Sequence, residues 1–154
     1  AYHAIVWGAP RERTSLVEGN VGRNPFDRKR MAVLRGQGKP ARTRYATLEA
    51  FGTRDKAFAA LLECRLETGR THQIRVHLAG AGFPIAGDAK YGDFALNKRL
   101  ARGEAAPLRF ERMFLHARRL QLTHPATGHN VVLEASLPKE CDNLVQAIQS
   151  AVSK

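Results

Sequence analysis

The densest group of chemically active side chains in this sequence lies at residues 69–78, which read GRTHQIRVHL. Arg70 and Arg75 supply two guanidinium groups there, and His72 and His77 supply two imidazole rings. Such a cluster is costly to order unless it holds something anionic or a reactive group. We expect a helix to begin within this stretch, and a helix N-terminus offers free N–H groups and a partial positive charge. The stretch therefore predicts a site for a phosphate or a carboxylate.

Helical spacing separates these side chains into two faces. His72 and Arg75 are three residues apart and share one face, while Gln73 and His77 are four apart and share another. Apolar residues between them would dock the helix on the core. A guanidinium presented in this way is a good partner for a buried carboxylate, whose pKa it lowers and whose rotamer it fixes. The alternative for Arg75 is a structural salt bridge with no part in the chemistry.

Asp88 is the acid best placed near the expected helix, and it follows Gly87 in a glycine-punctuated loop. The turn preference of aspartate indicates that its carboxylate holds the loop by accepting backbone N–H bonds. Asp88 and Glu67 could serve a metal-dependent nuclease, but no acid pair has the spacing of a two-metal site. His72 and His77 lack a third ligand and the two cysteines form no CxxC pair, so we expect no metal. The sequence contains no Walker loop or GxGxxG, so we expect no cofactor.

Charge is the second functional signal. The chain of 154 residues carries a formal net charge of +11, and residues 23–44 hold eight Lys or Arg residues against one acid, Asp27. This excess implies a polyanionic partner, with nucleic acid ahead of an acidic membrane surface. The alternatives are a generally soluble basic protein and, for residues 23–44, a solvated surface loop. We expect the basic loop to contact phosphates. No apolar run approaches the roughly 20 residues that span a membrane, and we expect a cytoplasmic protein.

The pattern along the chain predicts an α+β fold. Apolar residues recur at every second position in 57–67, so we expect one face of that strand to be buried. Strands do not alternate strictly with helices, which favours a mixed, largely antiparallel sheet with flanking helices and loops. We expect a helix at 71–79 and a last helix whose N-cap is Asp142. Strands are expected at 2–7, 15–21, 31–34, 43–51, 57–67, 113–122 and 130–136.

Three stretches carry a resemblance to a known family. They are 68–77 (TGRTHQIRVH), 84–92 (PIAGDAKYG) and 114–120 (FLHARRL). On these residues the chain resembles the RluA-type pseudouridine synthases, which isomerise uridine in ribosomal and transfer RNA. The opening residues 2–6 (YHAIV) are similar to the strand that carries the active-site tyrosine of that family. Together the matching pieces span nearly the whole chain and imply a pseudouridine synthase-like fold.

The resemblance also implies roles for individual residues. Arg75 would form an ion pair with the catalytic aspartate of the family, and Tyr2 would stack on the uracil that leaves the RNA stack. Without the resemblance, Tyr2 reads as an ordinary packed strand aromatic. The implied substrate-binding residues are Ile74, Leu78, Arg70, His72 and Gln73. The implied contacts to the RNA backbone come from Arg28, Lys29, Arg30, Arg42, Arg44, Arg118 and Arg119.

The catalytic aspartate of the family lies in a segment that reads roughly His-Arg-Leu-Asp, followed closely by Thr-Ser-Gly. Residues 1–154 contain no such segment, and the first residue is not Met. We therefore expect residues 1–154 to be a single domain, the C-terminal part of a catalytic domain, with the aspartate and any N-terminal RNA-binding domain outside it. On this interpretation the fragment alone is inactive and the full-length enzyme is a monomer. The alternatives are half of a split enzyme, a catalytically dead relative and a non-catalytic basic RNA-binding module.

Overall fold

The computed structural model describes residues 1–53 and 55–152. Its strands are β1 (Tyr2–Trp7), β2 (Thr14–Glu18), β3 (Asn20–Arg23), β4 (Met31–Leu34), β5 (Arg42–Thr53), β6 (Lys56–Leu66), β7 (Leu115–Ala117), β8 (Arg119–Thr123) and β9 (Asn130–Glu134). Its helices are α1 (Gln73–Gly80), α2 (Phe94–Ala101) and α3 (Lys139–Val152). Every strand pair among the described residues is antiparallel. The predicted α+β class with a largely antiparallel sheet is therefore confirmed.

The central sheet has the strand order β2-β5-β6-β1-β7, which brings the first strand of the chain into the fold interior. β1 lies antiparallel beside β6, with Tyr2 opposite Cys64. On its other side β1 pairs with β7, so that Tyr2 is also opposite Ala117. The apolar run from Ala4 to Trp7 is buried, as expected for a strand that is covered on both faces. The register therefore fixes Tyr2 between segments that are distant in sequence.

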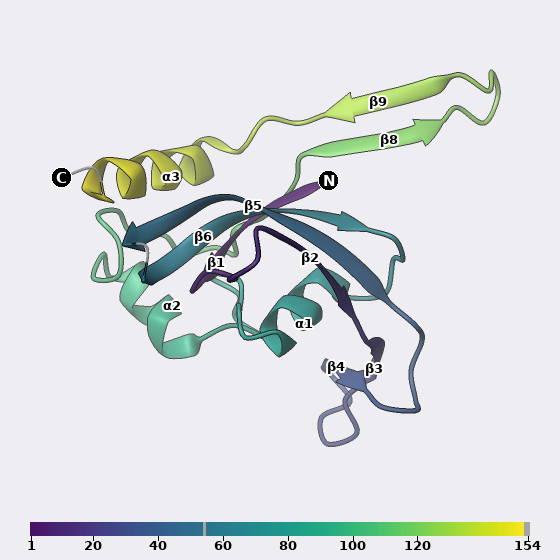
Figure 1. Cartoon of the computed structure of the whole chain (residues 1–154), viewed down its shortest axis with the longest axis horizontal. Helices are drawn as coiled ribbons and strands as arrows, with labels where there is room; N and C mark the ends of the chain where they lie inside the picture. The colour runs from purple at the N-terminus through teal and green to yellow at the C-terminus, as the bar shows by residue number, and fades with distance from the viewer. Residues whose placement is uncertain (54, 153–154) are drawn as a thin grey trace.

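Helices cover both faces of the central sheet (Figure 1). Ala59 and Leu61 of β6 join an apolar cluster that includes the buried side of α3, while Ala60 and Leu62 join a second cluster that includes α1. The alternation along β6 is therefore present, but the expectation that only one face is buried is wrong. Alternate positions of a strand point to opposite sides of the sheet, and here each side has its own helix to pack against.

Two hairpins leave the central sheet, and both divide segments that were expected to be single strands. The stretch 15–21 is split at Gly19 into β2, which stays in the sheet, and β3, which pairs with β4. The stretch 113–122 is split at Arg118 into β7 and β8, and β8 pairs with β9. Alternation of side chains does not record which sheet a strand joins, so the sequence pattern could not reveal either division.

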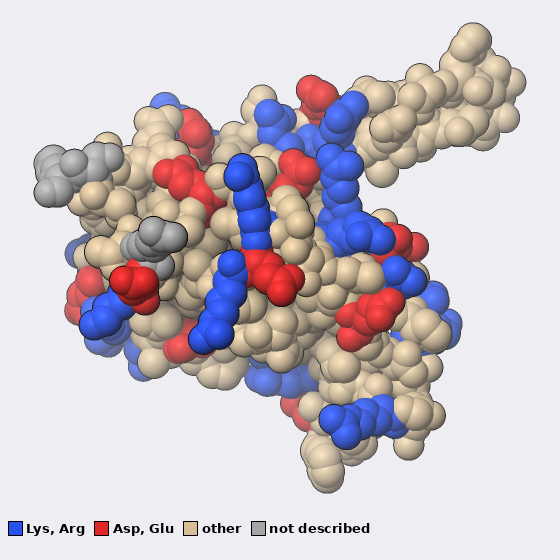
Figure 2. All heavy atoms as spheres, viewed as in Figure 1, with Lys and Arg blue, Asp and Glu red and all other residues tan. Residues whose placement is uncertain are grey.

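The β8–β9 hairpin forms an arm that projects from the body of the molecule (Figure 1). Residues 120–133 contain no Asp, Glu, Lys or Arg, and the arm is correspondingly free of charged side chains in Figure 2. The last helix begins at Lys139, so Asp142 lies in its first turn and is not the N-cap. No helix in the described part of the chain is long and apolar enough to cross a membrane.

We predict that Phe114→Ala lowers the free energy of unfolding by about 3–5 kcal/mol, because truncation of a buried ring leaves a cavity. Phe114 is fully buried in the cluster on the α3 side of the sheet. Chemical denaturation of the parent and the variant measures the difference. The control is Phe26→Ala, since Phe26 is 97% exposed, and its effect should stay within about 0.5 kcal/mol. Equal losses in the two variants would contradict this assignment of the core.

Candidate active site

Helix α1 is docked on the sheet by the apolar stripe that its sequence predicts. Ile74 and Leu78 are buried in the cluster that contains Ala60 and Leu62 of β6. The residue before the helix, His72, has φ 55° and ψ 25°, and no other non-glycine residue in the described part of the chain has a positive φ. Such a left-handed conformation is uncommon for a residue with a side chain and persists where the surroundings hold it in place.

One polar face of α1 is fastened to the sheet by a buried hydrogen-bond network. Gln73 Nε2 donates to the carbonyl oxygen of Arg42 and to Thr43 Oγ1, each at 2.9 Å. His77 Nε2 bonds to the carbonyl oxygen of Gly19 at 2.9 Å, and because a carbonyl only accepts, Nε2 carries the proton. In the neutral tautomer that carries this proton, Nδ1 accepts from the Thr43 hydroxyl, at 2.8 Å. The predicted face with Gln73 and His77 therefore fixes the position of α1 on the sheet.

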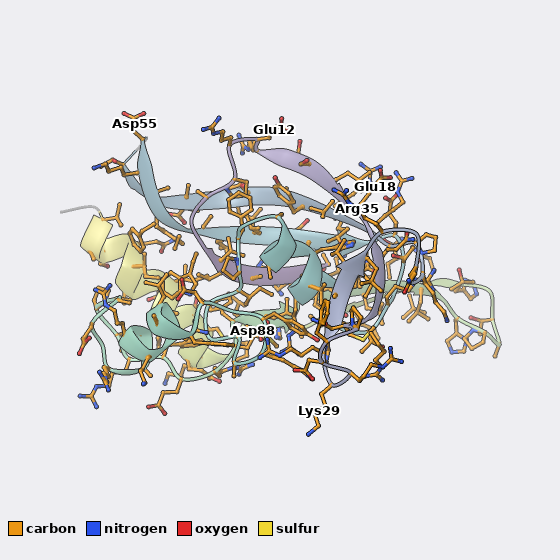
Figure 3. All side chains as sticks on the ribbon, turned by 90° about the horizontal axis from the view of Figure 1, so that it is seen from below. Glu12, Glu18, Lys29, Arg35, Asp55 and Asp88 are labelled. Carbon is orange, nitrogen blue, oxygen red and sulfur yellow. The ribbon has the colours of Figure 1, made fainter. Side chains whose placement is uncertain are left out.

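The other polar face of α1 carries an ion pair. Arg75 Nε donates to Asp88 Oδ2 at 2.9 Å, and Nη2 donates to Oδ1 at 2.8 Å. The side chain of Asp88 is 1% exposed and that of Arg75 is 18% exposed. Asp88 Oδ1 also accepts the N–H groups of Lys90 and Tyr91, which confirms that Asp88 holds its loop. Figure 3 shows Asp88 within the body of the molecule, whereas Lys29 projects from its edge.

The hydrogen bonds around Asp88 determine the protonation states of Asp88 and Arg75. Burial alone raises the pKa of the Asp88 carboxyl group, but hydrogen bonds from Arg75 and from two backbone N–H groups outweigh burial and lower the pKa overall. The hydrogen bond to Asp88 in turn raises the pKa of Arg75. Both groups are therefore ionised at neutral pH.

Arg75 thus has a carboxylate partner within this chain. The resemblance implied a different partner, an aspartate outside residues 1–154. Two of the three guanidinium nitrogens bind Asp88, and no described residue accepts a hydrogen bond from the third, Nη1. That donor is available for a second anion, so the catalytic role of Arg75 stays a prediction.

Tyr91 joins the ion pair to the start of the helix and to the β3–β4 hairpin. Its hydroxyl accepts the N–H of Met31 at 2.9 Å and lies 2.8 Å from His72 Nδ1. Burial and the nearby Arg75 charge lower the pKa of His72, so the neutral ring accepts the Tyr91 proton. The guanidinium carbon of Arg75 lies 5.0 Å from the centroid of the Tyr91 ring. The sequence analysis gave Tyr91 no role, although it lies three residues after Asp88 in a stretch that carries the family resemblance.

Tyr2 lies on the side of the sheet that α1 covers. Its side chain is partly buried and packs against the apolar cluster that contains Ile74 and Leu78. Arg75 belongs to the same helix as Ile74, so the helix that carries the guanidinium packs on the side of the sheet where Tyr2 lies. No hydrogen bond joins Tyr2 to Arg75 among the described residues, and what they share is the face and the apolar cluster between them.

Four of the basic residues expected to contact the substrate or RNA have no carboxylate partner in the described part of the chain. Arg28 and Lys29 are exposed in the loop between β3 and β4. Arg70 donates from Nε, and Arg118 from Nη1, to backbone carbonyl groups, each at 3.0 Å. These side chains keep their positive charge free for an anion.

The remaining predicted RNA contacts are already paired with acids. The pairs are Arg30–Asp27, Arg42–Glu18, Arg42–Glu67, Arg44–Glu67 and Arg119–Glu134, with N–O distances between 3.1 and 3.7 Å. Glu67 is therefore bonded to arginines, as Asp88 is, which argues against a nuclease built on these two carboxylates. No group of three or more His, Cys, Asp or Glu residues in the described ranges is arranged to hold a metal ion.

Comparison with known proteins shows the family. A family profile described as RNA pseudouridylate synthase matches residues 1–80. The chain is 45% identical over 149 residues to ribosomal large subunit pseudouridine synthase D of Nitrosomonas europaea. It is 42% identical over 152 residues to an uncharacterized RNA pseudouridine synthase of Chloroflexus aurantiacus. The chain belongs to the RNA pseudouridylate synthase family, in agreement with its resemblance to RluA-type enzymes.

Two solved structures share the fold. The human proteins RNA Pseudouridylate Synthase Domain Containing 1 and 4 match with TM-scores of 0.69 and 0.70, at 28% and 26% sequence identity. The matches cover 97% and 96% of this chain, and 64% and 61% of the human chains. For the two bacterial relatives, the alignments cover 97% and 99% of this chain but 40% and 43% of the relatives. The chain therefore spans about two-fifths of the length of these curated relatives.

We predict that Asp88→Asn weakens the fold at neutral pH. The folded-state pKa of Asp88 is lowered, so its stabilisation is complete above the unfolded pKa of about 4 and is lost as the pH falls through the folded value. Removing one member of a buried pair costs about 3–5 kcal/mol, and the difference from the parent should shrink in acid. Urea denaturation at neutral pH and near pH 3 measures both quantities.

The matched control for this prediction is Asp55→Asn, at a residue on the exterior of the molecule (Figure 3). It should change the free energy of unfolding by no more than about 0.5 kcal/mol at either pH. A loss in Asp88→Asn that stays the same from neutral to acidic pH would contradict a stabilising charge on Asp88.

We predict that Tyr91→Phe loosens the β3–β4 hairpin without unfolding the protein, because it removes the hydroxyl that accepts the Met31 N–H. Amide hydrogen exchange at Met31 should become faster. The pKa of His72 should rise, since a hydrogen bond donated to the unprotonated ring favours the neutral form. NMR measures both. The control is Tyr45→Phe, whose hydroxyl bonds to no described residue, and identical behaviour of the two variants would count against the Tyr91 contact.

Proposed function

We propose that residues 1–154 form a single domain, the C-terminal part of a catalytic domain that isomerises specific uridines in ribosomal RNA to pseudouridine. Membership of the RNA pseudouridylate synthase family supports the reaction class. The name of the Nitrosomonas europaea relative, which places that protein's action on the ribosomal large subunit, supports ribosomal RNA as the substrate. The observation that carries the proposal is the Arg75 guanidinium, held by a buried carboxylate on the side of the sheet where Tyr2 lies.

The proposed reaction rearranges the atoms of uridine and adds none. The uridine leaves the RNA stack, the bond between C1′ and N1 breaks, the uracil turns, and C5 bonds to C1′. The proton lost from C5 is balanced by the proton gained at N1. An aspartate of the family, which we expect on a segment outside residues 1–154, attacks or deprotonates at the sugar. No metal or cofactor takes part in the steps proposed.

Arg75 would act on that aspartate through Nη1, the guanidinium nitrogen that Asp88 does not use. Because Asp88 holds the other two donors, the direction of the third is set before the aspartate arrives. A preorganised positive group stabilises developing charge without the cost of reorienting during the reaction. Tyr2 would stack on the displaced uracil from β1, where strands on both sides fix its position.

The predicted substrate-binding residues divide into two roles. Leu78, Gln73 and Ile74 are at most 5% exposed, so we assign them the docking of α1 and not direct contact with the base. His72 and Arg70 are only partly buried, and we propose them as the substrate contacts of this stretch. The RNA backbone would be held by Arg28, Lys29 and Arg118, with Arg30, Arg42, Arg44 and Arg119 exchanging their carboxylate partners for phosphates.

A second candidate function is a non-catalytic RNA-binding module. The observation in its favour is that Asp88 already neutralises Arg75, as a purely structural salt bridge would. Both candidates bind RNA with a steep dependence on salt concentration. They differ in whether uridine is changed, and this difference is what the next experiment measures.

We predict that Arg75→Ala in the full-length protein lowers the rate of pseudouridine formation in ribosomal RNA by about 10²-fold or more, because a preorganised charge is lost. RNA binding should persist. Arg75→Lys is the second variant, since it keeps a charge beside Asp88 but cannot reproduce the forked donor geometry, and it too should be slow. Detection of pseudouridine in isolated ribosomal RNA after single-turnover incubation measures the rate.

The control is Arg102→Ala, an exposed arginine at the C-cap of α2, which should leave the rate unchanged. Full activity in Arg75→Lys and Arg75→Ala would exclude the assigned role. Tight RNA binding by the unaltered full-length protein with no pseudouridine formed would favour the non-catalytic module.

A further inference from the structure

A hollow of about 400 Å³ lies between the β3–β4 hairpin and the residues that lead into α1. Its walls come from the hairpin, from residues 38–39 and from residues 69–71. Three of the lining side chains are positively charged, namely Arg23, Lys39 and Arg70, and none of the lining residues is an Asp or Glu. The hollow is therefore cationic on several sides at once.

These three charges have no carboxylate partner among the described residues. Arg23 donates from Nη1 to the carbonyl oxygen of Arg28 at 3.3 Å, and Arg70 donates from Nε to that of Pro40 at 3.0 Å. The side chain of Lys39 forms no hydrogen bond or ion pair in the described part of the chain. Like charges around one hollow repel one another, and a bound anion relieves that repulsion.

We propose that this hollow binds a phosphate of the RNA backbone beside the target uridine. Guanidinium and ammonium groups are the natural partners of phosphate oxygens. The backbone is also accessible there, because a Cβ placed on Gly69 would meet no atom within 4 Å. The affinity for phosphate follows from the hollow itself, while the identity of the ligand as RNA rests on the proposed function.

The hollow is joined to the Arg75 site by two of its own lining residues. Met31 lines it, and the N–H of Met31 donates to the same Tyr91 hydroxyl that bonds to His72. Thr71 also lines it, and the next residue is His72. A phosphate held here therefore lies next to the groups that surround Arg75, where the uridine itself would be bound.

The first experiment uses this chain and inorganic phosphate as the probe. Titration followed by NMR should shift the backbone amides of residues 69–71 saturably, and Lys39→Ala should weaken the affinity by roughly threefold, the scale of one exposed charge pair. Lys39→Glu should remove the response. Lys39 bonds to Val21 through its backbone, which both substitutions retain, so loss of the fold is not expected.

The matched control is Lys56→Ala, which removes the same charge at the first residue of β6, outside the hollow. It should leave the phosphate affinity unchanged. Equal losses in Lys39→Ala and Lys56→Ala would mean that net charge alone attracts phosphate and would overturn the site, as would an unaltered affinity in Lys39→Glu.

The second experiment tests RNA as the ligand. In the full-length protein, Lys39→Ala should raise the KM for ribosomal RNA by the same factor as it weakens phosphate, with kcat unchanged, and should lower the slope of log affinity against log salt by about 1. An unchanged KM in an active enzyme overturns the inference and leaves the proposed function intact. Weakened RNA binding by Lys39→Ala in a protein that forms no pseudouridine supports the hollow and overturns the proposed function.

Discussion

The burial of the Asp88 carboxylate is the constraint on which the candidate site depends. An ionised carboxylate in this position would cost several kcal/mol without partners, and the fork of Arg75 and two backbone N–H groups offset that cost. The same bonds tie the loop 84–92 to α1. Tyr91 is carried by that loop, so the contacts of its hydroxyl with His72 and Met31 also depend on the ion pair.

The polar residues of α1 have two roles: some bond the helix to the sheet, and others lie on a side that is partly accessible to solvent. Gln73 and His77 bond to β5 and to the β2–β3 turn, and Gln73 Oε1 also accepts from the Thr68 hydroxyl and the Arg70 N–H. Arg75 and His72 lie on the side that stays partly accessible. Buried hydrogen bonds fix the Gln73 and His77 side of α1, and apolar packing fixes Ile74 and Leu78. The Arg75 guanidinium is therefore positioned by buried groups that a substrate would not touch. Such positioning is what a preorganised site requires.

The Lys and Arg side chains behind the net charge of +11 differ in how far nearby carboxylates neutralise them. Arg42, Arg44 and Arg119 are partly neutralised by glutamates, and exposed pairs of this kind contribute little to stability. Several charges without carboxylate partners, namely Arg23, Arg28, Lys29, Lys39 and Arg70, lie on the β3–β4 hairpin and around the hollow beside it, while others, such as Arg118, lie elsewhere on the described part of the chain. Part of the charge that can act on a polyanion therefore lies close to Tyr91 and Arg75, which the total charge alone would not reveal.

Local periodicity in the sequence determined most of the elements and the division of α1 into faces, because periods of 3.6 and 2 depend on near neighbours. The turn preference of aspartate, which is equally local, indicated the role of Asp88 in its own loop. The strand at 2–7 was readable from the same local periodicity, and the resemblance of 68–77 was readable from the identities of its residues. Only the tertiary structure decided that both faces of β6 are buried, that Arg75 binds Asp88, and that Tyr91 contacts Met31, 60 residues earlier. These contacts depend on the sheet order, on which hairpins leave the sheet and on which helix covers which face. No pattern of adjacent residues carries that information.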